Sequence, residues 1–113
     1  MNSIKTEKIR DIWVIKLLTK SLNFPEAAQL QNAYSQLKII EMSYIILDLT
    51  YMDTINSNGI GCVLVLWRSA TNEHKIKDFI LVTNNQILIE MFKLKGPRLF
   101  SSFDEALVYC NNN

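Results

Sequence analysis

The sequence is poor in the residues that break or cross-link a chain. Among 113 residues there are only 3 Gly, 2 Pro and 2 Cys. So little Gly and Pro excludes a collagen-like chain and a low-complexity disordered one. Cys62 and Cys110 match no CxxC pair and no Cys/His zinc spacing, which excludes a disulfide framework and a structural zinc site. We expect both cysteines to be reduced, buried packing residues.

An excess of one charge sign and a long apolar run are also missing. The 12 Lys and Arg nearly balance the 11 Asp and Glu, so no broad field attracts nucleic acid or anionic lipid. The longest apolar stretch, Gly59 to Trp67, is far shorter than the roughly 20 residues that span a bilayer. Residues 1–13 contain no apolar signal core. These absences predict a cytoplasmic protein with no nucleic-acid partner and no direct membrane insertion.

What the sequence does have is the composition of a packed globular protein, with 49% hydrophobic and 20% charged residues. Its length is that of one ordinary domain, so we predict a single domain over residues 1–113. A domain of this size buries about two thirds of its unfolded surface, so its core closes without a metal or disulfide. We expect no metal site and no cofactor.

Strand and helix patterns alternate along the chain. Short apolar or β-branched runs predict strands over 4–9, 12–18, 44–50, 79–82 and 98–100. Apolar residues at helical spacing, each set preceded by a capping residue, predict helices within 23–40, 56–67, 84–94 and 102–110. The order β-β-α-β-α-β-α-β-α predicts an α/β fold, a mixed, mostly parallel β-sheet flanked by four helices. The polar first strand is expected at an edge.

The segment from Thr50 to Gly61 connects the most apolar strand to the next helix. In sheets of this kind, sites form where strand ends meet helix starts. Asn56 or Ser57 is the expected N-cap, and Gly59 and Gly61 would let another backbone approach the first turn. A helix start also presents free N–H groups and a positive dipole end. We therefore place the candidate binding site here.

The same segment resembles a known family. It reads Leu47-Asp48-Leu49-Thr50, then Asn56-Ser57-Asn58-Gly59-Ile60-Gly61, and a late helix begins Phe103-Asp104-Glu105-Ala106-Leu107. This is similar to the STAS domain, and within it to the bacterial anti-sigma factor antagonists. Their strand ends Leu-Asp-Leu-Ser and their helix begins Asp-Ser-Ser-Gly-Leu-Gly. The resemblance covers the order of elements over nearly the whole chain and implies the STAS fold.

The resemblance implies a regulatory role, but this chain differs from the family at the residue that is phosphorylated there. In the family, the second Ser of Asp-Ser-Ser-Gly is phosphorylated by a GHKL-type serine kinase that is also the anti-sigma factor. That Ser aligns with Asn58 and the preceding Asp with Asn56. Asn has no hydroxyl, so we expect no phosphorylation at position 58. Ser57, the family's first Ser, is the remaining candidate phosphorylation site.

The resemblance further implies that the protein works by docking and is not an enzyme. The expected partner is a GHKL-type serine kinase/anti-sigma factor, with Asn58 fixing the chain in its binding form. The alternative is a non-switching STAS accessory subunit of a lipid-transport ATPase complex. The expected partner-binding residues lie around the helix start: Met52, Asp53, Thr54, Ile55, Asn56, Ser57, Asn58, Gly59 and Gly61.

Three other residues carry a structural interpretation beside a functional one. Asp48 is expected to accept hydrogen bonds from loop N–H groups rather than to bind metal. Trp67 is expected in the core rather than at an interface, and His74 on the surface rather than as a base for Ser57. Asn58 precedes Gly59, the dipeptide most prone to deamidation, which would place a carboxylate at position 58.

Overall fold

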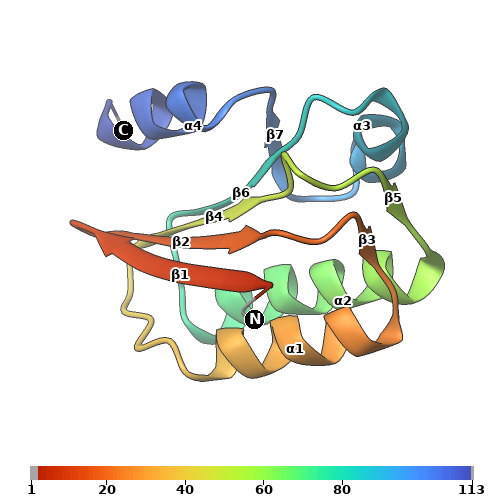
Figure 1. Ribbon diagram of the computed structural model, residues 1–113. Coiled ribbons are helices and arrows are strands. Elements are labelled where there is room, and N and C mark those ends of the chain that lie inside the picture. Colours follow the sequence, from red (N-terminus) through yellow and green to blue (C-terminus); the bar gives the residue numbers. More distant parts are fainter. Residues whose placement is uncertain (1–2, 113) are drawn as a thin grey trace.

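The structure is a computed structural model and describes residues 3–112 (Figure 1). Its main sheet has five strands in the order β1-β2-β4-β6-β7. These are β1 (Ile4–Ile9), β2 (Ile12–Leu17), β4 (Tyr44–Asp48), β6 (Asp78–Val82) and β7 (Arg98–Phe100). Only the β1–β2 pair is antiparallel. The predicted mixed, mostly parallel sheet and the edge position of the first strand are therefore confirmed.

Four α-helices accompany the sheet, as predicted. They are α1 (Phe24–Ser35), α2 (Ser57–Arg68), α3 (Gln86–Phe92) and α4 (Phe103–Asn111), and a π-helical turn (Ser69–Glu73) extends α2. In Figure 1, α1 and α2 lie against one face of the sheet and α4 against the other, while α3 stands beside its end. Among residues 3–112, no helix has the length and apolar character that crossing a membrane requires.

The sheet separates two apolar cores, which explains the sequence of its central strand. Ile45 and Leu47 belong to the core under α1 and α2, whereas Tyr44 and Ile46 belong to the core under α4. Every residue of β4 is buried, because alternate side chains of a strand point to opposite faces and both faces are covered. A continuous apolar run is what a strand in this position requires.

The structure also contains two short strands that the sequence patterns did not predict. β3 (Ser21–Leu22) and β5 (Thr54–Ile55) pair in parallel as a separate sheet. β3 leads directly into α1 and β5 into α2, so their pairing brings the two helix starts side by side (Figure 1). Two residues are too few to show the alternation by which a strand is recognised.

The first helix ends earlier than the sequence predicts. Apolar spacing extended it to Ile40, but α1 ends at Ser35. The N–H groups of Gln36 and Leu37 bond to carbonyls three residues back, and Met42 adopts a left-handed φ of 64°. Leu37 still packs on the core while Ile40 is exposed. The apolar residues after Ser35 therefore belong to an irregular segment, and Leu37 packs on the core without being helical.

The third helix also differs from its prediction. Its N-cap is Asn85 rather than Asn84, and the Asn85 side chain accepts hydrogen bonds from the N–H groups of Ile87 and Leu88. Ile87 and Leu94 fit the apolar spacing of the helix expected within 84–94, which predicts that they point inward, but both are exposed, Leu94 to 97%. The buried residues of α3 are Leu88 and Phe92, and Leu94 lies beyond the helix end with a φ of 61°.

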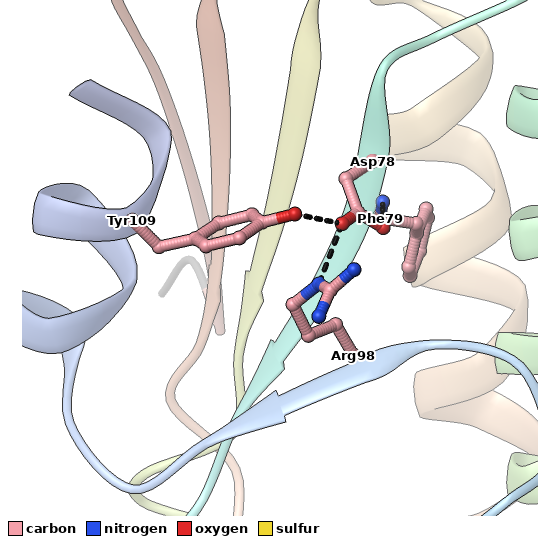
Figure 2. Close-up of polar contacts among 4 residues, drawn as sticks. All are labelled: Asp78, Phe79, Arg98 and Tyr109. Carbon is pink, nitrogen blue, oxygen red and sulfur yellow. Dashed lines mark hydrogen bonds and ion pairs between the residues drawn. The ribbon is translucent and has the colours of Figure 1, made fainter. Parts of the chain in front are cut away.

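Helix α4 is held on its face of the sheet by one carboxylate. Figure 2 shows Asp78, at the start of β6, between Arg98 of β7 and Tyr109 of α4. Asp78 Oδ2 accepts hydrogen bonds from Arg98 Nε and from the Tyr109 hydroxyl, both at 2.6 Å. The Arg98 guanidinium lies 4.7 Å from the centre of the Tyr109 ring. The hydrogen bond to Asp78 is the main cause that raises the pKa of Tyr109.

We predict that Tyr109→Phe lowers the free energy of unfolding by about 1 kcal/mol at neutral pH, because Asp78 loses one hydrogen bond. The pKa of Tyr109 is higher in the folded state than in the unfolded one. This stabilisation is therefore present below pH ~10 and is lost as pH rises through the folded pKa. Urea denaturation at neutral and alkaline pH measures both effects. Tyr51→Phe is the control, and an equal loss in both variants would contradict the prediction.

Candidate docking surface at the start of helix α2

The segment that precedes α2 starts from a structural carboxylate. Asp48, at the end of β4, is 4% exposed. Its Oδ1 accepts hydrogen bonds from the backbone N–H of Thr50, at 3.0 Å, and from the Thr50 hydroxyl. The predicted role as an acceptor for the loop is confirmed. In the part of the chain that the structure describes, no group of three His, Cys, Asp or Glu side chains is placed to hold a metal ion.

The loop between β4 and α2 is fixed from two sides. The N–H groups of Asp53 and Thr54 donate to the carbonyl of Lys20, at 2.8 and 3.1 Å. On the other side, Asn85 Nδ2 donates to the Asp53 carbonyl at 3.1 Å. Lys20 also lies 3.7 Å from the Asp53 carboxylate and over the ring of Tyr51. The loop before α2 is therefore tied to the segments that lead into β3 and α3.

The sequence left Asn56 and Ser57 as alternative N-caps of α2, and the structure shows that Asn56 is the cap. Its backbone is extended, and its Oδ1 accepts a hydrogen bond from the Gly59 N–H at 2.9 Å. This satisfies one of the donors that a helix start leaves free. Ser57 and Asn58 are the first two residues of the helix, and both are exposed.

The two glycines of the first turns have different roles. A Cβ on Gly59 would lie 2.3 Å from the Leu22 carbonyl oxygen and 2.7 Å from Ile55 Cγ1. Gly59 therefore permits the close backbone approach that the sequence predicted. A Cβ on Gly61 would meet nothing within 4 Å, so the expectation of a close approach there is wrong. Gly61 is exposed and leaves the helix surface bare.

The structure divides the predicted binding residues into a buried and an exposed set. Met52, Ile55 and Gly59 are buried and belong to the support of the helix start. The exposed members surround that start, and we call them the α2-start surface: Asp53, Thr54, Asn56, Ser57, Asn58 and Gly61.

Three exposed apolar residues on neighbouring elements were missed by the sequence reasoning. Phe24 is 74% exposed at the start of α1, Tyr51 50% exposed in the loop after β4, and Ile87 59% exposed at the start of α3. Their elements adjoin the α2-start surface through the β3–β5 pair and the Asn85–Asp53 hydrogen bond. Each of the three exposes apolar surface on an element that adjoins the α2-start surface. The sequence could have indicated Phe24 and Ile87 only as apolar residues in the first turn of a helix, and it gave no such signal for Tyr51.

Ser57 and His74, considered from the sequence as a nucleophile and its base, are not brought together. Ser57 begins α2 and His74 follows the π-helical turn, so His74 lies 17 positions further along a continuous helix, about 25 Å away. His74 instead packs edge-to-face with Tyr34. Cys62 and Cys110 are free and buried, as predicted, and burial raises the pKa of Cys110 to about 12. Neither thiol is poised as a nucleophile.

Comparison with known proteins identifies the fold. The sequence matches no protein-family model and no curated protein. The structure is similar to that of a STAS domain protein from Planctomyces limnophilus, with a TM-score of 0.82, 17% identity and coverage of 97% of this chain and 98% of that one. It is also similar to the unphosphorylated anti-sigma factor antagonist SpoIIAA, with a TM-score of 0.70, 20% identity and coverage of 97% and 98%.

A third similar structure comes from a much larger protein. The murine anion transporter Slc26a9 matches with a TM-score of 0.74 and 16% identity, over 95% of this chain but only 19% of the transporter. The class that these matches define is an α/β domain of the anti-sigma factor antagonist type. More particularly, this chain has the STAS fold, and the resemblance seen in the sequence is confirmed at the level of fold.

Two alanine substitutions test how α2 is held. We predict that Gly59→Ala lowers the free energy of unfolding by about 1–3 kcal/mol, because the new methyl group displaces the Leu22 backbone. Gly61→Ala, the matched control, is expected to raise it by about 0.5–1 kcal/mol, since the methyl group enters open space and Ala favours a helix. Chemical denaturation measures both. Similar effects of the two substitutions would refute the distinction between the glycines.

Proposed function

We propose that the chain is an anti-sigma factor antagonist-like regulatory protein that binds a GHKL-type serine kinase/anti-sigma factor through the α2-start surface. One observation carries the proposal: in a STAS fold, an exposed polar helix start is held rigidly beside a bare Gly61. A fixed surface loses little conformational entropy on binding. The exposed Phe24, Tyr51 and Ile87 add apolar area at the margin of this surface.

Position 58 decides how such binding is regulated. Asn58 has no hydroxyl, so the protein is not phosphorylated there and stays in its binding form. Ser57 is the candidate phosphorylation site: it is exposed, and it is the first helical residue. A phosphate at Ser57 would suit the positive end of the helix and would change the charge that a partner meets.

A second candidate function has one observation in its favour. The fold also occurs within the anion transporter Slc26a9. The alternative is therefore a non-switching STAS accessory subunit of a lipid-transport ATPase complex. Such a subunit would use the same helix without phosphorylation.

Affinity purification from native cells tests the proposal with two variants that make the same chemical change. We expect the GHKL-type kinase to copurify with wild type, and at least about tenfold less with Asn58→Asp, because a buried unpaired charge at an interface costs more than about 1.4 kcal/mol. Asn72→Asp, in the exposed π-helical turn at the far end of α2, is the control and should retain the partner. Mass spectrometry identifies what is retained.

Each other outcome has a definite meaning. Recovery of a transport ATPase with wild type would support the accessory role. Retention of the kinase by Asn58→Asp, measured again with the purified kinase by calorimetry, would show that the α2-start surface is not the interface.

A further inference from the structure

Asn58–Gly59 is the only Asn-Gly pair in the sequence, and the structure places its reacting atoms in contrasting surroundings. Asn58 is exposed, and among residues 3–112 no hydrogen bond engages its side-chain amide. The Gly59 nitrogen, by contrast, is held by the Asn56 side chain at 2.9 Å. Gly59 itself is buried against the Leu22 carbonyl. The side-chain amide of Asn58 is therefore open to solvent, whereas the backbone nitrogen of Gly59 is held by the fold.

The reaction is an intramolecular substitution followed by hydrolysis. The Gly59 backbone nitrogen loses its proton to solvent and forms a bond to Asn58 Cγ. The Cγ–Nδ2 bond then breaks, and the amide nitrogen takes up a proton from solvent and leaves as ammonia, which gives a cyclic imide. Water adds to either imide carbonyl and opens the ring, leaving an aspartyl or an isoaspartyl residue at position 58. No oxidant, reductant or enzyme takes part.

We propose that Asn58 is a site of self-catalysed deamidation whose rate is set by the Asn56 cap. In the folded helix the Gly59 N–H is occupied and the backbone between residues 58 and 59 is helical, so the nitrogen cannot reach Cγ. The first turn of α2 must open before the bond forms. Helix ends open locally far more easily than the whole protein unfolds. Asn56 therefore acts as a positioning residue that protects its neighbour.

The aspartyl product suits its position. A carboxylate in the first turn of a helix interacts favourably with the dipole, so the fold is retained after the reaction. The product adds one negative charge to an exposed site on the α2-start surface. Whether that charge releases a partner depends on the proposed function, but the reaction itself does not. An isoaspartyl product inserts a methylene group into the backbone and disrupts the first turn.

The test follows deamidation at position 58 by peptide mapping during incubation of the purified chain near neutral pH. Asn56→Ala removes the cap and should react about fivefold faster than wild type, the factor that corresponds to the ~1 kcal/mol of an N-cap. Asn56→Asp keeps a capping oxygen and should react at close to the wild-type rate. In urea, where the cap is absent, all three chains should react equally fast.

Equal rates for folded wild type and folded Asn56→Ala would overturn the proposal, as would wild type reacting as fast when folded as in urea. If Asn56→Ala does not fold, wild type alone provides the test. Urea at concentrations too low to unfold the protein should then raise two rates in parallel, that of hydrogen exchange at the Gly59 amide and that of deamidation at Asn58. Deamidation that does not follow this opening would contradict control by the cap.

A separate measurement addresses the partner. Aged wild type should lose retention of the kinase in proportion to the modified fraction. If modification proceeds as predicted but retention is unchanged, the proposed docking surface is wrong while the modification site stands.

Discussion

The close approach of Gly59 to the Leu22 carbonyl is the contact on which the candidate site depends. It joins α2 to β3, and the β3–β5 pair joins the segments that lead into α1 and α2. Leu22 and Ile55, the apolar members of that pair, are buried in the same core as Met52. Because strands of two residues give little stability on their own, the β3–β5 pair depends on its contact with α2. A Cβ at position 59 would clash with the Leu22 carbonyl oxygen, so this contact requires glycine.

The main sheet was predictable because its determinants are local. Tyr44 to Leu47 is apolar throughout and buried, and a run of this kind is typical of a strand covered on both faces. The caps were predictable for the same reason, since Ser102 accepts from the Glu105 N–H within one turn. The parallel order then followed from the alternation of strands and helices. Short-range patterns were enough to predict the fold class.

The rest of the candidate site was not predictable, because it is set by contacts between distant residues. Nothing near Gly61 in sequence distinguishes it from Gly59. The difference is that Leu22, far along the chain, lies against one and not the other. Phe24 and Ile87 likewise reach the edge of the site only through β3 and Asn85. Leu94 satisfied a helical spacing but lies past the point where the backbone leaves the helix.

The separation of buried support from exposed surface means that the fold does not depend on the side chain at position 58. Met52, Ile55 and Gly59 hold the helix start, whereas Asn58 makes no contact on which that start depends. A serine or an asparagine at position 58 is therefore compatible with the same backbone. The similarity to the unphosphorylated form of SpoIIAA is a similarity of fold. Chemistry at position 58 is determined instead by its own side chain and by Asn56, which holds the neighbouring nitrogen.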